Sequence, residues 1–466
     1  MWDVIIVGAG AAGLYLGVQL QTRHQRVLIL ESYKDVGGRV VTHRDKQGLQ
    51  WEIGAGRIAT DHAMTLALVK RYGLTVAPID TESDYHGSPN PFSLLLPALV
   101  APLAAVPTIG RYTLKTLLDK VHGASAADAY VRMFPYYGEI YTLRADLALR
   151  SFQTEFSDAA NYVVCREGYD AITDGLLHEF ERLGGVVQTG VHVNDVTEHG
   201  QGVTVISRDG PTFEGSTCVL ALHANALKTI PFAKKHMRAL RHLAMEPLVR
   251  MYAVFPTRRG RVWFQDLPKQ VFDGPVRYMI PINPAKGLIM ISYTDGADAR
   301  HWIKEQKRIG DKGIQAAVLR EMRAAYPDRD IPDPTVFKVY PWTAGCTYWT
   351  PGAYDPVDEA REAMVLGDRV FACGESISLK QAWVEGALES AAALLDSGLL
   401  NKRSNTYTMA HKRPTRKQTK QQRRKTQRRK TQRKSGGGKA IACNKDTGNP
   451  CPKTCSYAPG LGGYYC

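Results

Sequence analysis

The first chemistry that residue spacing indicates is the binding of a nucleotide diphosphate. Near the amino terminus the chain has the pattern G-x-G-x-x-G as Gly8-Ala9-Gly10-Ala11-Ala12-Gly13. In this pattern Gly8 permits a tight turn, Gly10 lets backbone N–H groups approach a pyrophosphate, and Gly13 allows a helix to pack closely on a strand. Glu31, which follows Gly13 by 18 residues, can accept hydrogen bonds from ribose hydroxyls.

These residues need a strand, a helix and a second strand to position them. Residues 2–7 form a continuous apolar run that ends at the first glycine, as a buried parallel strand does. Helical spacing follows over residues 11–23, and Ala12 lies in the first turn, at the end of the helix that attracts negative charge. A second apolar run, 27–30, ends at Glu31. The chain therefore opens with the β-α-β unit that a dinucleotide site requires.

The rest of the body predicts a mixed fold. Short strands separated by turns are expected over residues 186–222, and residues 248–255 and 276–294 alternate as strands of an antiparallel sheet do. Helical patterns occur at 63–72, 169–183, 311–326 and 383–396. We therefore expect an α/β nucleotide-binding domain that is interrupted by a second, mixed α+β domain.

Length and charge separate a globular body from a basic tail. The 466 residues are 44% hydrophobic, which excludes a collagen-like or wholly disordered chain and favours two domains. The net charge of +15 is concentrated in residues 402–439, which hold 16 Lys and Arg and no Asp or Glu, so that residues 1–401 carry a net charge of −2. This tail contains RRKTQ at 423–427 and again at 428–432. Because like charges repel, we expect it to be disordered.

Cysteine usage and targeting signals favour an intracellular protein. Four cysteines are scattered through the body as reduced thiols would be, and four crowd the last 24 residues with the spacing C-x7-C-x3-C-x10-C. That spacing matches no common zinc pattern, so we expect a disulfide-bearing or simply flexible end and no metal site. No signal peptide precedes the first strand, so we expect a cytoplasmic or nuclear protein that is not secreted. Three prolines interrupt the uncharged stretch 92–109, for which we expect a buried segment and no transmembrane span.

Three blocks in the right order carry a resemblance to a known family. Glu31 is followed by Gly37-Gly38-Arg39, and Val370-Phe371-Ala372-Cys373-Gly374-Glu375 precedes Trp383-Val384-Glu385-Gly386-Ala387. The combination resembles the flavin-containing amine oxidase family, which includes monoamine, polyamine and L-amino-acid oxidases. The resemblance implies FAD as cofactor, in a Rossmann-like FAD-binding domain interleaved with a mixed α+β substrate domain. The expected boundaries are 1–80, 160–245 and 360–400 for the FAD-binding domain, 81–159 and 246–359 for the substrate domain, 401–439 for the basic disordered tail, and 440–466 for a Cys-containing segment.

The resemblance also assigns cofactor contacts. Toward the nucleotide and diphosphate these are Glu31 at the adenosine ribose, Val193 at the adenine through its backbone, and Gly38 and Arg39 at the diphosphate and the flavin side. Along the flavin they are Gly54, Ala55, Gly56 and Arg57 beside the isoalloxazine, and Gly374 and Glu375 along the diphosphate and ribityl chain. Val384, at a helix start, would offer its N–H to the flavin O2 edge, where the helix dipole stabilises the negative charge of reduced flavin.

The family oxidises the C–N bond of an amine, after which the imine hydrolyses and O2 becomes hydrogen peroxide. In monoamine and polyamine oxidases two aromatic rings flank the amine. Trp383 matches one such position, and Tyr348 or Trp349 is the candidate for the second. The alternative is that these rings belong to an ordinary core.

Two positions depart from the family pattern. Gly345-Cys346 stands where monoamine oxidases carry a flavin thioether, but Thr347 follows and the next aromatic is shifted by one residue. We therefore expect non-covalent FAD, with a thioether to Cys346 as the alternative. Arg250 stands where many members place a lysine near flavin N5. Arginine keeps the charge that can assist oxygen reduction but cannot act as a base, and the alternative is that Arg250 merely pairs with a carboxylate.

Arg57 bears on the substrate. The block that contains it, 54–58 followed by His62, resembles the segment of L-amino-acid oxidases that supplies a carboxylate-binding arginine. A guanidinium fork suits a carboxylate well. Residues 287–294, with Asp298 and Ala299 beyond them, resemble the same branch. We therefore favour an amino acid or a similar carboxylated amine.

Other functions fit parts of the same pattern. One is an FAD-dependent oxidase or desaturase of a non-amine substrate, and another is a flavin-fold protein that mainly binds through its basic tail. Residues 402–439 are a candidate for sequence-independent binding of nucleic acid or for an import receptor. No aromatic residue lies between residues 408 and 439, so stacking on bases is not expected.

Overall fold

The computed structural model describes residues 1–401, with gaps at 47, 80–82, 86–102, 104–105, 107, 133, 155–160 and 209, together with residues 456–458 and 463–465. The chain divides into two units, Met1–Lys402 and Arg403–Cys466. In the second unit, β19 (Ser456–Ala458) pairs with β20 (Gly463–Tyr465) in antiparallel fashion. The basic segment 402–439 and the four C-terminal cysteines lie outside the described residues, so the roles proposed for them stay predictions.

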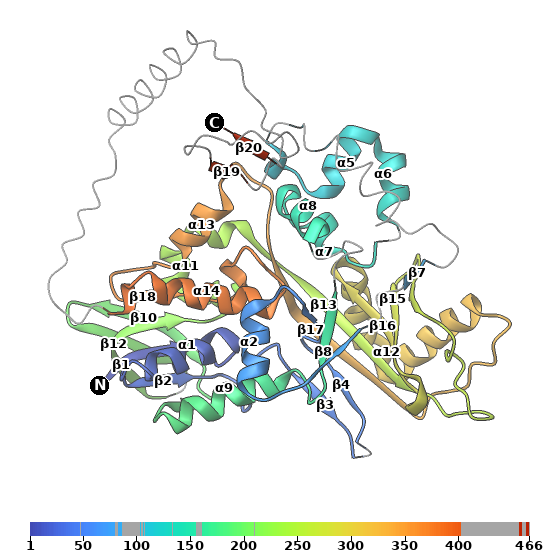
Figure 1. Ribbon diagram of the computed structural model, residues 1–466, viewed down its shortest axis with the longest axis horizontal. Coiled ribbons are helices and arrows are strands. Elements are labelled where there is room, and N and C mark those ends of the chain that lie inside the picture. The colour runs from blue at the N-terminus through green and yellow to red at the C-terminus, as the bar shows by residue number, and fades with distance from the viewer. Residues whose placement is uncertain are drawn as a thin grey trace, which may run out of the picture. The chain divides into compact units, whose positions relative to one another are not determined.

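A seven-stranded sheet carries the glycine loop (Figure 1). In order along the sheet, its strands are β10 (Val193–His199), β11 (Gly202–Ser207), β12 (Thr212–Leu220), β1 (Trp2–Val7), β2 (Val27–Leu30) and β9 (Val186–Gln188), and β18 (Val370–Ala372) pairs with β12. The pairs that join β12, β1, β2, β9 and β18 are parallel, whereas β10, β11 and β12 form antiparallel pairs. Because the carboxyl ends of parallel strands meet at one edge, Gly8, Glu31 and Cys373 follow their strands at the same edge.

The central strand of this sheet is buried on both faces, as its unbroken apolar run predicts. Ile5 and Val7 belong to one apolar cluster, and Val4 and Ile6 belong to another. The second cluster includes the inner faces of α1 (Ala11–Gln21), α9 (Asp170–Arg182) and α14 (Val384–Asp396), which cover the sheet. The helices expected at 11–23, 169–183 and 383–396 are thus confirmed.

A second, six-stranded sheet contains β17 (Val336–Trp349), β13 (Leu243–Val254), β16 (Leu288–Asp295), β15 (Tyr278–Asn283), β14 (Lys269–Val271) and β7 (Ser83–Asp84), in that order. α12 (Gly296–Ala325) shares an apolar cluster with one face of it. This helix is longer than the expected 311–326, and it is interrupted at Gly310, whose φ is 66°. β17 pairs along most of β13, although its sequence did not predict a strand.

The remaining elements connect these two sheets. The strands are β3 (Thr42–Arg44), β4 (Gln50–Glu52), β5 (Ile58–Ala59), β6 (Val76–Pro78) and β8 (Tyr162–Cys165). The helices are α2 (Ala63–Arg71), α5 (Leu114–His122), α6 (Ala124–Val131), α7 (Gly138–Tyr141), α8 (Ala145–Thr154), α10 (Ala224–Leu227), α11 (Pro231–His236) and α13 (Pro356–Ala363). Short 3-10 helices are η1 (Ile109–Arg111), η2 (Arg238–His242), η3 (Pro284–Lys286), η4 (Glu375–Ile377) and η5 (Leu399–Asn401).

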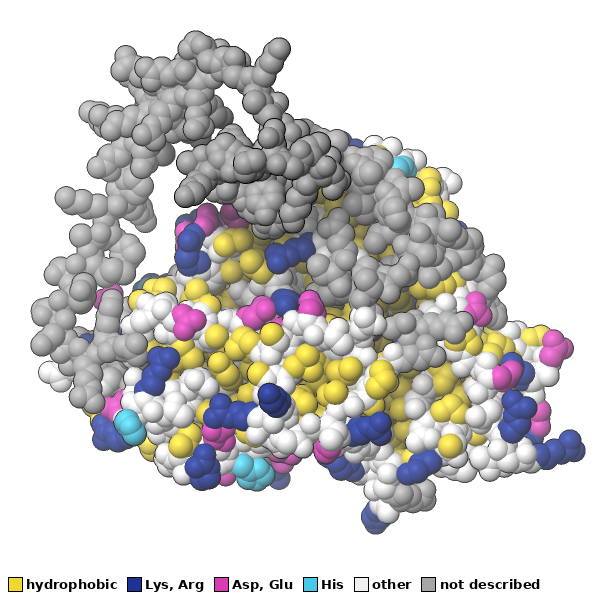
Figure 2. Space-filling view, in the orientation of Figure 1, with side chains coloured by type: hydrophobic (Ala, Val, Ile, Leu, Met, Phe, Trp, Pro, Cys, Tyr) yellow, Lys and Arg dark blue, Asp and Glu magenta, His cyan; other side chains and the backbone are white. Residues whose placement is uncertain are grey.

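The strands of the two sheets come largely from the two sets of segments that the sequence assigned to an FAD-binding and a substrate domain. Because residues 1–402 form one compact unit, those boundaries stay a prediction. Within the described part of the chain, no helix is long and apolar enough to cross a membrane. The stretch 92–109 lies largely outside that part. On the face seen in Figure 2, positive and negative side chains are interspersed, in keeping with the near-neutral charge of residues 1–401.

Candidate functional site

The glycine loop joins β1 to α1 and leaves space in front of the helix. Gly8 has a φ of 107°, and a Cβ there would lie 2.5 Å from the carbonyl oxygen of Ala221. A Cβ on Gly13 would lie 2.0 Å from the carbonyl oxygen of Gly8. At Gly10, the N-cap of α1, a Cβ would meet no atom of the described chain within 4 Å. The start of α1 is therefore open to a phosphate group.

Glu31 lies beside this loop. Its Oε2 accepts a hydrogen bond from the backbone N of Ala9 at 2.8 Å, and its Oε1 accepts one from the backbone N of Tyr33 at 2.9 Å. The backbone N of Val191 donates to the carbonyl oxygen of Glu31 at 2.8 Å. This bond brings the start of β10, with the buried Val193, next to the end of β2. The predicted adenosine residues thus lie at one edge of the sheet.

Backbone contacts connect the glycine loop to residues 37–39 and to residues 54–57. A Cβ on Gly38 would lie 3.5 Å from the Cα of Gly10. The backbone N of Ala55 donates to the carbonyl oxygen of Arg39 at 2.9 Å. A Cβ on Gly54 would lie 2.0 Å from the same oxygen. The glycine loop, residues 37–39 and residues 54–57 therefore form one continuous wall, and at Gly54 the backbones approach too closely for a larger residue.

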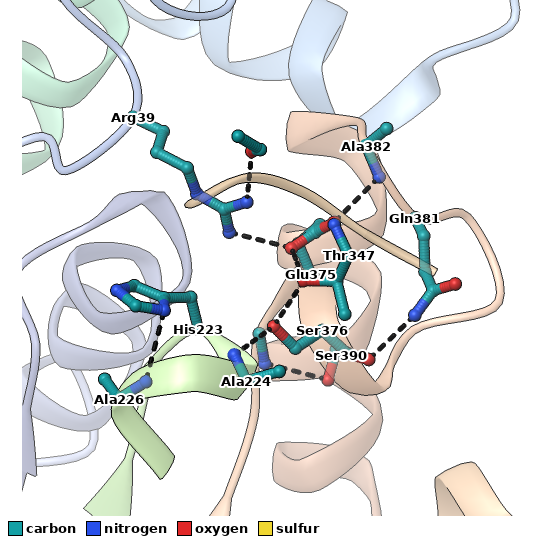
Figure 3. A network of polar contacts seen from close by, with 12 residues as sticks. Arg39, His223, Ala224, Ala226, Thr347, Glu375, Ser376, Gln381, Ala382 and Ser390 are labelled. Atoms are coloured by element: carbon teal, nitrogen blue, oxygen red, sulfur yellow. Dashed lines mark hydrogen bonds and ion pairs between the residues drawn. The ribbon is translucent and has the colours of Figure 1, made fainter. Parts of the chain in front are cut away.

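Arg39 and Glu375 bind each other in a network that joins the blocks from the two ends of the body (Figure 3). Nη2 of Arg39 donates to Oε2 of Glu375 at 2.7 Å, and Nη1 donates to the carbonyl oxygen of Gly345 at 2.8 Å. Oε1 of Glu375 also accepts from the backbone N of Thr347 at 3.1 Å and of Ala382 at 2.9 Å. Burial opposes the charge, but Arg39 and these donors hold the pKa of Glu375 below its ordinary value. The pair attaches β17 to the cofactor edge.

Arg250 of β13 lies against the segment that leads to the isoalloxazine block. Its Nη1 donates to the carbonyl oxygen of Glu52 at 2.8 Å and would lie 3.3 Å from a Cβ on Gly56. Its guanidinium carbon is 4.8 Å from the ring centre of Tyr293. Burial opposes the charge, yet the neighbouring tyrosines hold the pKa of Arg250 above its ordinary value. Arg250 forms no direct ion pair with a carboxylate in the described ranges, but the nearby Glu52 contributes to its raised pKa, so the role of Arg250 stays a prediction.

Arg57 lies in an aromatic cage, by which we mean the rings of Tyr136, Tyr162 and Trp383. Its guanidinium carbon is 5.5, 4.8 and 5.3 Å from the three ring centres, respectively. Burial opposes the charge, but the surrounding tyrosines hold the pKa of Arg57 above its ordinary value. No Asp or Glu of the described segments forms an ion pair with Arg57. A permanently charged guanidinium without an anionic partner is suited to bind one.

Trp383 precedes α14 as its N-cap. Its ring lies parallel to that of Tyr162 at 6.0 Å, and the ring of His62 meets it edge-on at 4.8 Å. The hydroxyl of Tyr348 donates instead to Oε1 of Glu139 at 3.2 Å. Among the described residues, the ring of Trp383 stacks on Tyr162. It makes no ring contact with Tyr348 or Trp349, two described aromatics of β17 that the sequence proposed as the second wall. The catalytic role of Tyr348 stays a prediction.

Cys346 of β17 carries a free, half-buried thiol. It lies opposite Glu246 of β13 and two residues before Tyr348. Burial and the nearby Glu375 raise the pKa of this thiol far above its ordinary value. Because the thiolate is the nucleophile, this shift of the pKa disfavours reaction of the thiol near neutral pH.

A cavity of about 290 Å³ adjoins this region. It is lined by Asp61, His62, Glu139, Leu143, Leu147, Arg150, Ser151, Tyr348, Leu379, Lys380, Gln381 and Glu389. His62 is 1% exposed, and burial together with Lys380 lowers its pKa to about 4. The imidazole is therefore neutral at pH 7, and it separates the cavity from the ring of Trp383.

The sequence did not single out the tyrosines that surround Arg57. Tyr136 lies 5.8 Å from Tyr293 and 6.1 Å from Tyr278, measured between ring centres. Together with Tyr162 these residues come from four separate segments, so no spacing pattern links them. Tyr278 and Tyr293 fell within the predicted strand region 276–294, and only Tyr293 also fell within the block 287–294 that resembles L-amino-acid oxidases.

Comparison with known proteins places this geometry among flavoenzymes. The family model described as flavin containing amine oxidoreductase matches residues 11–129 and 111–393. An L-amino-acid oxidase of Siganus canaliculatus is 25% identical over 454 residues, which cover 83% of this chain and 83% of the relative. The flavin-dependent L-tryptophan oxidase RebO of Lentzea aerocolonigenes is 25% identical over 473 residues, covering 84% and 96%. Polyamine oxidase 7 of Oryza sativa subsp. japonica is 23% identical over 394 residues, covering 73% and 81%.

A likeness among solved structures concerns the fold. A double mutant of putrescine oxidase has a TM-score of 0.67 at 17% identity and covers 86% of this chain and 99% of its own. At that identity the match confirms the expected α/β architecture and nothing about the substrate.

Proposed function

The chain belongs to the family of flavin-containing amine oxidoreductases, and we propose that it oxidises an L-amino acid or a similar amine with a carboxylate near the nitrogen. The product would be the imine, with O2 reduced to hydrogen peroxide. As in the rest of the family, FAD would accept the two electrons of the oxidation when it is bound. The relatives named above act on amino acids and on polyamines, so the choice between these substrates must come from this chain's own residues.

Arg57 is the observation that carries the proposal. Its charge is fixed, it has no carboxylate partner among the described side chains, and three aromatic rings surround it. In such a low-dielectric setting an ion pair is stronger than in water. A carboxylate would therefore bind there, whereas the two or more ammonium groups of a polyamine would be repelled.

The residues of the cofactor wall fit FAD. We propose that the open start of α1 at Gly10 receives the diphosphate, with Gly38 beside it. Gly374 has a φ of 128°, and a Cβ there would meet only the carbonyl oxygen of Leu222, at 3.9 Å, so this backbone also leaves room for a ligand. Glu31 would accept from the ribose. On the flavin side, Gly56 and the start of α14 at Val384 would line the ring.

Arg250 would serve the oxidative half of the reaction. Its guanidinium lies against Gly56 and keeps its positive charge without a direct ion pair to a carboxylate of the described residues, although Glu52 lies near enough to help raise its pKa. A fixed positive charge stabilises the negative charge that develops as O2 is reduced. This role requires no proton transfer, which arginine could not provide.

The proposal is tested on the purified, FAD-loaded protein with matched pairs of L-amino acids and their decarboxylated amines, together with polyamines. Anaerobic bleaching of the flavin and aerobic release of peroxide are followed for each compound. We expect bleaching by one or more L-amino acids at concentrations where the matched amines are inactive. Bleaching by polyamines alone would contradict the carboxylate requirement, and bleaching by none would contradict amine oxidation.

We further propose that the flavin is held without a covalent bond. The raised pKa of Cys346 keeps its thiol protonated, which disfavours a thioether. After acid precipitation the yellow colour is expected in the supernatant, and Cys346→Ser is expected to retain the flavin content of the wild type. A yellow pellet that turns colourless in Cys346→Ser would show a thioether instead.

A further inference from the structure

Tyr136 forms one wall of the aromatic cage and is connected to α7 through Tyr137. Its ring centre lies 5.5 Å from the guanidinium carbon of Arg57 and 5.8 Å from the ring centre of Tyr293. The position of this ring therefore depends on what holds the backbone at the start of α7.

Asp295, the last residue of β16, holds that backbone. Its side chain does not cap α12, which begins at the next residue. Instead, Oδ1 accepts from the backbone N of Tyr137 at 2.6 Å, and Oδ2 accepts from the backbone N of Gly138 at 2.7 Å. The residue is 7% exposed. Both carboxylate oxygens are thus used to fix the two residues that follow Tyr136.

Close packing limits where this segment can lie. A Cβ on Gly296 would be 2.0 Å from Cδ1 of Tyr137, and a Cβ on Gly138 would be 2.4 Å from Cε2 of Tyr348. The start of α7 is therefore confined between the β16–α12 junction and β17. Because α7 is confined in this way, weakening the two hydrogen bonds to Asp295 is expected to displace the residue before Tyr137. That residue is Tyr136, whose ring faces Arg57.

The two ends of α7 are held by carboxylates of different kinds. After the carboxyl end, the hydroxyl of Thr142 donates to Oε1 of Glu246 at 2.6 Å, and Glu246 forms an ion pair with Arg300. Asp295 has no such cation: in the described ranges it forms no ion pair, and its bonds are to backbone N–H groups. No cation therefore holds Asp295 in its charged form, and its bonds to the two N–H groups are what fix the start of α7.

We propose that Asp295 is a positioning residue that, through the backbone of Tyr137 and Gly138, keeps Tyr136 against Arg57 and thereby sets the affinity of Arg57 for a carboxylate. The proposal rests on the proposed function, because it concerns the same carboxylate site. In this role Asp295 touches neither the substrate nor the cofactor. It acts through α7 alone.

The charge of Asp295 makes this device respond to pH. Burial raises the pKa of Asp295 to about 6. The two backbone donors oppose this shift, and the negative charges of Glu246 and Asp298 add to it. Titratable and charged groups surround Asp295 on each element packed against it. The sheet contributes Tyr293 on its own strand, Glu246 on β13, and Cys346 and Tyr348 on β17. The helices contribute Asp298 and Arg300 on α12, with Arg277 paired to Asp298, and Tyr136 and Glu139 at α7. Below about pH 6 the protonated acid is a weaker acceptor, and its hold on α7 loosens.

The sign of the shift argues against a purely stabilising role. The folded-state pKa lies above the ordinary value of 3.8, so the unfolded chain ionises first as the pH rises. The folded state then loses stability between about pH 4 and pH 6, and the cost persists above that range. An ionised Asp295 therefore lowers the stability of the fold while it orders α7. Its charge is better explained by a positioning role than by a stabilising one.

The test measures binding of benzoate, a carboxylate without an amine, to the FAD-loaded protein by the change in flavin absorbance. Benzoate titrates near pH 4 and stays largely ionised between about pH 5 and pH 8. In the wild type we expect its Kd to rise by roughly 2- to 30-fold as the pH falls through about 6, the range typical of indirect coupling. In Asp295→Asn we expect the weaker Kd at every pH, with the pH dependence removed.

The direction of the change separates positioning from simple electrostatics. Removing a negative charge near Arg57 should, by Coulomb's law alone, tighten benzoate binding. Protonation of Glu52, whose burial raises its pKa to about 7, and of His62 would also tighten it as the pH falls. Weaker binding in Asp295→Asn and at low pH therefore reports the loosened α7.

Asp298→Asn is the matched control, because it removes the same charge from α12, where Asp298 pairs with Arg277 and not with the backbone N–H groups of Tyr137 and Gly138. It is expected to keep the pH dependence, with the midpoint slightly lower. Tighter or unchanged binding in Asp295→Asn, or a flat wild-type profile, would overturn the positioning role and leave the proposed function standing. A wild type that does not bind benzoate would overturn both.

Discussion

In Arg57→Ala, the KM for the L-amino acid substrate is expected to rise by about 10- to 150-fold, while the KM for the matched amine without a carboxylate changes much less. Hydrogen bonds to a charged group contribute about 1.5–3 kcal/mol, and each 1.4 kcal/mol is about tenfold in affinity. Among the described residues, Arg57 is the cation whose guanidinium lies over the three rings of the cage. Steady-state peroxide release over the substrate pair measures the effect.

Two further variants locate its cause. Arg57→Lys keeps a charge but loses the planar fork, so we expect a KM between those of the wild type and Arg57→Ala. Arg308→Ala removes an exposed arginine that pairs with Glu305 and serves as the matched control, with an unchanged KM. An equal rise of KM for both members of the substrate pair would show that Arg57 supports the shape of the cage and does not bind the carboxylate.

The parts of the fold that could be predicted from sequence are those whose signals are local. The run 2–7, the glycine loop and Glu31 lie within 31 residues, and they form the strand, turn and strand end that their pattern predicts. β17 escaped prediction because Pro341 and Gly345 interrupt its sequence, and both residues ordinarily mark the end of a strand. Its pairing with β13 overrides those signals through a register shift between Glu246 and Leu248.

Site residues that belong to family motifs could be predicted from the sequence. Site residues that only tertiary contacts bring together could not. Arg39 and Glu375 were each assigned to the cofactor, but their mutual ion pair spans 336 positions, and no local pattern announces it. The tyrosines of the cage have the same origin, since packing alone brings Tyr136 and Tyr162 to Arg57. Arg57 itself stood in a recognisable block. Sequence thus identified the charged group and Trp383, and only the structure identified the tyrosines around them.

Gly10→Ala is expected to leave the protein folded and to weaken FAD binding by about 5- to 150-fold. Gly10 has φ −80° and ψ −177°, which alanine adopts, and its Cβ would meet no described protein atom within 4 Å. The methyl group would instead occupy the space that a diphosphate needs at the start of α1. A misfit of about 1–3 kcal/mol is typical of an added methyl in a close contact, and it corresponds to that change in Kd.

The comparison with Gly13→Ala shows why the position matters. There the Cβ would lie 2.0 Å from the carbonyl oxygen of Gly8, so the loop itself must open, and we expect a lower Tm together with the loss of FAD. Gly200→Ala is the control, because its Cβ also meets open space but lies in a turn between β10 and β11. Flavin-to-protein ratio, FAD titration by fluorescence and Tm distinguish the three variants. If Gly10→Ala bound FAD as tightly as Gly200→Ala, the cofactor would not approach the loop backbone at Gly10, and the open start of α1 would not be the diphosphate site.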